Sequence, residues 1–172
     1  MDQDETGTRR IGIPPVYWAP ALAIAACVAL VAHLVYGTAD SGSDLSVYHG
    51  GGSAIAHGKP LYDFASYNGL QFTYPPFAGI FMVPIGLLPM AAAVPVWAAL
   101  CTLALEATVW VVLGAVGVQE RRRALFTAAG TVAAFSLAPI SSNFWTGQIN
   151  TILMLLIVAD LVRPAGLGRG RE

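Results

Sequence analysis

Charged residues are scarce in this 172-residue chain: only 11% of its residues are charged, while 56% are hydrophobic. So little polar side-chain surface cannot cover a soluble globule of this size. The scarcity is also uneven, because no Asp, Glu, Lys or Arg occurs within residues 11–39, 64–105 or 124–159. A helix needs roughly 20 apolar residues to cross the hydrocarbon core of a bilayer. The three windows therefore predict an integral membrane protein with at least three spans.

Cysteine and clustered basic charge are rare as well, and each absence excludes a class of function. The two cysteines, Cys27 and Cys101, lie in apolar windows, and neither has a CxxC neighbour. This spacing argues against a zinc site or a thiol-redox site. The basic residues form short flanks instead of a patch, and the formal net charge is −1. No nucleic-acid partner is therefore expected, and no metal or other cofactor is predicted.

The placement of arginine decides how many crossings the chain makes. Prolines at 75, 76, 84, 89 and 95 interrupt the window 74–117, and the piece 77–88 has only 12 residues, which is short for a span. If that piece crosses the membrane, the cluster Arg121, Arg122 and Arg123 falls outside the cell. If it lies along the outer face, all eight arginines are cytoplasmic, which the positive-inside rule favours.

We therefore predict an all-α membrane protein with a bundle of four transmembrane helices in the plasma membrane. The expected spans are about 16–36, 93–117, 124–140 and 149–162, and together they make one module over residues 16–162. Residues 37–92 form an outer loop with helices at the membrane surface. Both ends are expected in the cytoplasm, as a tail over 1–15 and a disordered tail over 163–172.

The polar outer loop opens with an acidic residue that is a candidate catalytic group. If residues 44–52 are helical, Asp44 lies at the N-terminal end, where free backbone amides stabilise a carboxylate. Tyr48, four residues later, shares its face. The glycines at 50–52 would weaken such a helix by roughly 1 kcal/mol each, so close approach of a ligand or another helix is one explanation. The alternative interpretation is that Asp44 is only a helix cap.

For other polar residues, a ligand-binding role and a purely structural role are both open. Lys59 can meet an anionic ligand at the membrane surface, or it can form an ordinary loop pair with Asp63, which contributes little stability. Gln148 and Asn150 can hydrogen-bond sugar hydroxyls in both directions, or they can cap a short helix. Glu106 is the only acidic residue deep in the second expected span, where an ionisable group usually faces a cavity or a polar partner.

Three stretches in this order resemble the amino-terminal part of glycosyltransferase family 87, whose members are polyprenol-phosphate-mannose-dependent α-(1→2) mannosyltransferases of the membrane-embedded GT-C class. The first is DLSVY at 44–48, followed by GKPLYD at 58–63. The second is FTYPP at 72–76, running into PIGLLP at 84–89. The third is GQIN at 147–150, before an apolar helix that ends near Asp160. The resemblance covers residues 44–160, and family members are considerably longer.

The resemblance implies a GT-C-like bundle and an inverting hexosyltransferase that uses a polyprenyl-phosphate sugar as donor. The acceptor would be a lipid or glycan of the cell envelope, and a missing carboxyl-terminal half is a further possible partner. GT-C enzymes carry an essential acidic residue in the first outer loop, and Asp44 is the matching position. The candidate substrate-binding residues are Tyr48, Lys59, Tyr62, Asp63, Tyr74, Gln148 and Asn150. The alternative is a truncated, non-catalytic membrane subunit or paralogue that binds lipid or a partner protein.

Overall fold

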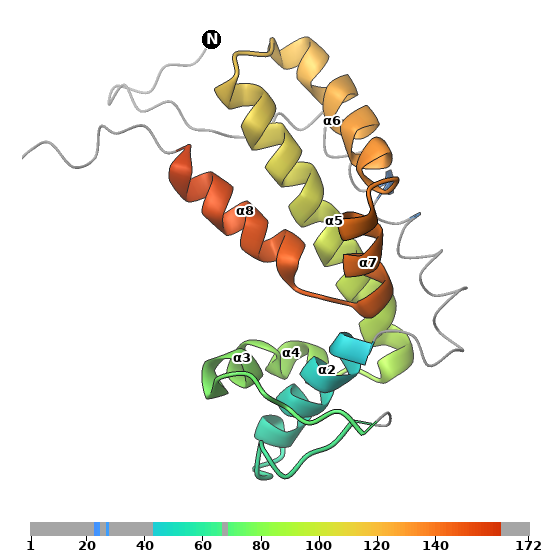
Figure 1. Cartoon of the computed structure of the whole chain (residues 1–172), viewed down its shortest axis with the longest axis vertical. Coiled ribbons are helices and arrows are strands. Elements are labelled where there is room, and N and C mark those ends of the chain that lie inside the picture. Colours follow the sequence, from blue (N-terminus) through green and yellow to red (C-terminus); the bar gives the residue numbers. More distant parts are fainter. Residues whose placement is uncertain (1–22, 25–26, 28–42, 67–68, 163–172) are drawn as a thin grey trace, which may run out of the picture.

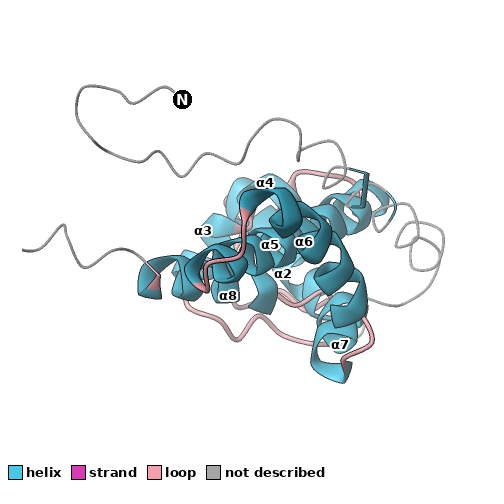
Figure 2. Ribbon diagram, turned by 90° about the horizontal axis from the view of Figure 1, so that it is seen from above, coloured by secondary structure: helices cyan, strands magenta, loops and turns pink. Residues whose placement is uncertain are grey.

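The computed structural model describes residues 23, 24, 27, 43–66 and 69–162. The expected first span at 16–36 lies outside the described residues apart from Ala23, Ile24 and Cys27, and both expected tails, 1–15 and 163–172, lie outside them entirely. The described ranges contain helices and loops without a strand (Figure 2), with one isolated bridge between Ala65 and Gln71. The expected all-α class is confirmed for this part of the chain.

Helix α5, Met90–Ala115, is the long axis of the fold. Its 26 residues correspond to a length of about 39 Å, which exceeds the roughly 30 Å of a hydrocarbon core. Among the described residues it is the one helix that is long and apolar enough by itself to cross a membrane. Its bounds agree with the expected span at 93–117 within a few residues.

The expected span over 124–140 is divided into two helices, a bend that the sequence analysis did not predict. Helix α6, Glu120–Ala134, and helix α7, Ala138–Thr146, are bent by 75° relative to each other. The cause is Pro139, in the first turn of α7, because proline has no N–H to continue α6 and suits the start of a new helix. Residues 141–146, which lie between the third and fourth expected spans, are therefore helical. Together the two helices are long and apolar enough for one broken span or a re-entrant loop.

Helix α8, Asn150–Leu161, runs back along α5. Its 12 residues give a length of about 18 Å, which is less than the thickness of the hydrocarbon core. The described residues thus contain one helix that can span a membrane, or two if the bent pair α6–α7 counts as one span. The arrangement with four crossings stays a prediction.

The three other helices of the described part of the chain lie in the expected first outer loop. Helix α2, Ser43–Ala56, packs on α3, Pro76–Phe81, and α4, Val83–Gly86. The piece 77–88, which we expected to lie along the surface, is thus two short helices that are far too short to span. The glycines of α2 explain the packing: an added Cβ at Gly50 would overlap the Phe64 ring, one at Gly51 the Phe72 ring, and one at Gly52 the backbone carbonyl of Met82. Close approach is therefore what these glycines permit.

Different segments of the chain lie near the two ends of α5 (Figure 1). Helices α2, α3 and α4 gather at its beginning, together with the turn between α7 and α8. The connection 116–119 from α5 to α6 and the end of α8 at Leu161 lie toward the opposite end. Residues 121–123 are therefore at the other end of α5 from Asp44, as the expected topology requires.

Candidate functional site

Asp44 lies in the first turn of α2 and is half-buried. It is the second residue of the helix, inside the first turn, where it benefits from the positive end of the helix dipole. Leu45, the next residue, is buried and packs against the turn between α7 and α8. The start of α2 is therefore fixed in place by a segment that is a hundred residues later in the sequence.

Three tyrosines are linked by hydrogen bonds, and one of them, Tyr48, is close enough to Asp44 for the carboxylate to affect its pKa. The Tyr48 hydroxyl donates to the Tyr74 hydroxyl at 3.3 Å, and the Tyr62 hydroxyl donates to the Tyr74 backbone carbonyl at 3.2 Å. Burial raises the pKa of Tyr48 well above its ordinary value, and the bond to Tyr74 and the nearby charge of Asp44 raise it further. Tyr48 therefore stays a neutral donor at all physiological pH values, and its bond orients the Tyr74 hydroxyl.

Trp97 of α5 joins this tyrosine cluster to the turn between α7 and α8. Its indole Nε1 donates to the Gly147 carbonyl at 2.8 Å, and its ring lies 6.3 Å from that of Tyr48. Gly147 ends α7 with φ of 75°, in the left-handed region, where glycine is favoured. Its Cα also faces Leu45, because an added Cβ would lie 2.5 Å from the Leu45 Cβ.

The amides that follow this turn bond to each other and do not cap α8. The Asn150 Nδ2 donates to the Gln148 Oε1 at 2.7 Å, and α8 begins without a side-chain cap. This bond leaves the Gln148 amide hydrogens available to a ligand, while the Gln148 backbone carbonyl accepts from the Cys101 thiol at 3.7 Å. The pair is an ordered hydrogen-bonding group at the same end of α5 as Asp44.

Lys59 and Asp63 do not lie with the tyrosines; they line a separate pocket of about 470 Å³. Both side chains are exposed, and His49 and Ser53 of α2 form part of the same wall. The His49 Nε2 is 2.8 Å from the Leu88 carbonyl and therefore donates to it. The structure thus separates the expected site residues into a group around Asp44 and Tyr74 and a group around Lys59.

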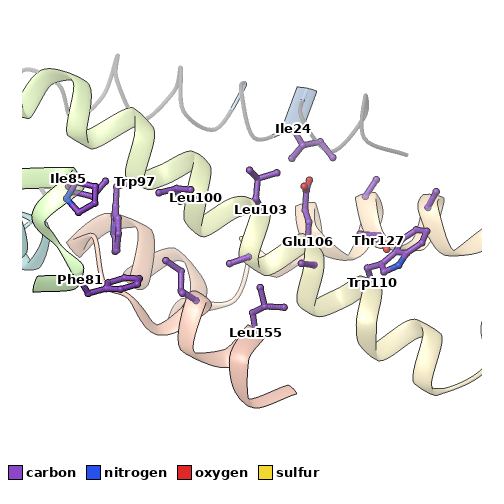
Figure 3. A pocket seen from close by; sticks show the side chains of 16 residues that line it. Ile24, Phe81, Ile85, Trp97, Leu100, Leu103, Glu106, Trp110, Thr127 and Leu155 are labelled. Carbon is purple, nitrogen blue, oxygen red and sulfur yellow. The ribbon is translucent and has the colours of Figure 1, made fainter. Parts of the chain in front are cut away.

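A long apolar groove begins beside Trp97 and follows α5 toward its other end (Figure 3). Its volume is about 590 Å³, and its lining runs from Phe81 and Ile85 to Trp110. Glu106 is part of this lining and is only 4% exposed, and neither of its oxygens has a hydrogen-bond partner in the part of the chain that is described. The sequence correctly singled out Glu106 as an isolated acidic group.

Two residues of the site were missed by the sequence analysis. Trp97 is buried, and it is the residue through which the tyrosines, the Gly147 turn and the groove are all connected. Its position in an apolar span gave only the signal of an interfacial aromatic. His49 was not singled out, because its contact with Leu88 depends on the packing of α2 on α4, which sequence spacing does not show.

Comparison with known proteins shows which family the chain is similar to. Residues 72–171 match glycosyltransferase family 87. A polyprenol-phosphate-mannose-dependent α-(1-2)-phosphatidylinositol pentamannoside mannosyltransferase of Mycolicibacterium smegmatis is 36% identical over 122 residues, which is 67% of this chain and 29% of that protein. Two polyprenol-phosphate-mannose-dependent α-(1-2)-phosphatidylinositol mannoside mannosyltransferases are also similar. The one from M. smegmatis is 37% identical over 136 residues, and the one from Mycobacterium tuberculosis is 36% identical over 147 residues.

These matches cover 69% and 76% of this chain, but only 31% and 34% of those relatives. The chain thus spans about a third of the length of the curated relatives it matches. No solved structure matches it. Because the family match includes more than half of the residues, and because the FTYPP and GQIN stretches both lie within it, the chain belongs to glycosyltransferase family 87.

Proposed function

We propose that this chain forms the amino-terminal part of a membrane-embedded hexosyltransferase. It transfers a mannosyl or related hexosyl group from a polyprenyl-phosphate sugar to a glycan or glycolipid of the cell envelope, on the outer face of the plasma membrane. One observation carries the proposal: the first turn of α2, Tyr74 and the Gly147–Asn150 turn meet around Trp97 at one end of α5. Membership of family 87 and the names of the relatives supply the reaction class.

Asp44 is the proposed catalytic residue. In transfer with inversion, the acceptor hydroxyl oxygen attacks the anomeric carbon while the bond from that carbon to the phosphate oxygen breaks. The polyprenyl phosphate leaves with the bonding electrons, and the hydroxyl proton passes to a base. Asp44 takes this proton, or it orients a base that the rest of a family-length protein supplies. Its half-exposed position in the first turn of α2 leaves the carboxylate accessible to an acceptor.

The neighbouring polar groups fit the binding of a sugar. The Tyr74 hydroxyl accepts a hydrogen bond from Tyr48 and can donate one to a ligand. The Gln148–Asn150 pair offers amide donors at the same end of α5. Lys59 and Asp63, in the separate pocket with His49, are proposed to contact a more distant anionic or polar part of a substrate. Tyr62 supports Tyr74 through the backbone bond.

The test measures sugar transfer in a family-length protein. This chain is joined to the remaining part of the M. smegmatis pentamannoside mannosyltransferase, and transfer from radiolabelled polyprenyl-phosphate mannose to membrane glycolipid is followed. Removal of a general base lowers turnover by about 10²–10⁴-fold, so Asp44→Asn is expected to show such a loss. Glu120→Gln, an exposed change at the start of α6, is the matched control and keeps full activity. Full activity of Asp44→Asn removes Asp44 from the mechanism.

A further inference from the structure

The groove along α5 combines an apolar wall with polar groups that lack partners. Glu106 and Thr127 both line it, both are buried, and their side-chain oxygens have no hydrogen-bond partner in the described ranges. Figure 3 shows the Glu106 side chain extending from α5 toward Ile24. An unpaired carboxyl group at membrane depth is unfavourable. A partner that brings a hydrogen-bond donor to this level of the groove would remove the deficit.

The described residues of the expected first span bring no donor to Glu106. Ile24, which lines the groove, is apolar, and Cys27 is not part of the lining. Within the described ranges, the carboxyl group therefore stays without a hydrogen-bond partner.

A hydrocarbon chain also fails to satisfy these groups. A polyprenyl or acyl tail fills an apolar groove well, but it has no N–H or O–H to offer Glu106 or Thr127. A transmembrane helix with one polar side chain satisfies both requirements, because it presents an apolar surface and a donor at a fixed depth. The lining from Trp97 to Trp110 runs for about 20 Å along α5, which is long enough for more than three turns of a packed helix.

The relatives indicate where such a helix would come from. The matched regions are only 29–34% of their length, so most of a family-length protein lies outside the region that this chain matches. We propose that the groove along α5 is the docking site for a transmembrane helix from that remaining part, with an arginine, lysine, asparagine or glutamine side chain placed at the level of Glu106 and Thr127. This interface is independent of the sugar-transfer chemistry proposed for Asp44.

Site-specific photo-crosslinking tests the proposal on the full chain. A benzophenone amino acid replaces Leu100, which lines the groove, or Val112, which does not; both are on α5 and both are 42% exposed. The chain is co-expressed with the epitope-tagged remainder of the M. smegmatis pentamannoside mannosyltransferase, whose presence in the membrane fraction is verified. The expected result is a covalent product with the remainder from Leu100 and none from Val112.

Variants of Glu106 show whether the polar contact matters. Glu106→Gln keeps a side chain that hydrogen-bonds, so it retains most of the product, whereas Glu106→Leu lowers the yield about three- to tenfold, the loss expected for one interhelical hydrogen bond. Circular dichroism and gel filtration in detergent verify that both variants are folded. A product from Leu100 only with lipid, only with a second copy of this chain, or no product at all overturns the proposal. Equal yields from Glu106→Leu and the unchanged chain overturn the role of Glu106.

Discussion

Gly52→Ala tests the packing that holds the outer-loop helices together. A Cβ at this position would overlap the Met82 carbonyl oxygen and lie 2.6 Å from its carbonyl carbon. These are backbone atoms between α3 and α4, so they cannot rotate away as a side chain would. Overpacking of this kind costs about 3 kcal/mol, while alanine gains about 1 kcal/mol over glycine within a helix. The expected net loss of unfolding free energy is about 2 kcal/mol.

Thermal unfolding of the purified protein in detergent, followed by tryptophan fluorescence, measures this loss. For a chain of this size, 2 kcal/mol corresponds to a decrease in Tm of roughly 4–8 °C. Gly130→Ala is the matched control, because an added Cβ on α6 meets only the Val109 Cγ1, at an ordinary contact distance of 3.4 Å. Its Tm stays unchanged or rises. If Gly52→Ala is as stable as Gly130→Ala, the close approach of α2 to α3 and α4 is refuted.

Three further predictions concern the cluster around Trp97. Trp97→Phe leaves the Gly147 carbonyl without its donor and lowers stability by about 1–3 kcal/mol; an unchanged Tm would contradict this bond. Gly147→Ala forces a positive φ on alanine and a contact with Leu45, so it lowers Tm and sugar transfer together, and normal transfer would show that the turn tolerates displacement. The pKa of Tyr48 is raised in the folded state, so the folded protein holds this proton more tightly than the unfolded chain does. The contribution of Tyr48 to the free energy of unfolding is therefore fully present below about pH 10 and is lost at higher pH. Tyr48→Phe should therefore weaken the fall in Tm above about pH 10, and an identical pH profile would refute the buried hydroxyl.

The sequence predicted those elements whose signals are local. A largely apolar window of sufficient length identified α5, and the polar stretch after residue 40 identified the region of α2 with Asp44 in its first turn. The glycines at 50–52 are unfavourable for a helix, and from the sequence close packing is one explanation for them. The structure identifies the groups that approach them as the rings of Phe64 and Phe72 and the backbone at Met82.

The bend between α6 and α7 was not predicted from the sequence. Pro139 lies within a window that otherwise reads as a continuous span, and its missing N–H divides that window into α6 and α7. The polar residues before Gly147 lie between two expected spans, but they belong to α7, and Gly147 marks its end. Both residues are visible in the sequence, but where the helix breaks or ends depends on the local backbone geometry.

Contacts between distant segments were beyond the sequence for a different reason. The bond from Trp97 to Gly147 joins residues that are 50 positions apart, and no periodicity or spacing specifies such a pair. The same holds for Leu45 against Gly147 and for the separation of Lys59 from Tyr74. The motifs indicated which residues to examine, and only the packing of α2, α5 and α7 shows which of them share a site.

The central claim is that one site, on one side of the membrane, is formed by the first outer loop and by the turn before α8. Labelling of intact cells with a membrane-impermeant maleimide tests it most directly, in a background in which Cys27 and Cys101 are replaced by alanine. Single cysteines are placed at three exposed positions, His57, Arg122 and Asn150. The account predicts labelling from outside at 57 and 150, and labelling at 122 only after the cells are permeabilised. Labelling from outside at all three positions, or at only one of 57 and 150, would contradict the account.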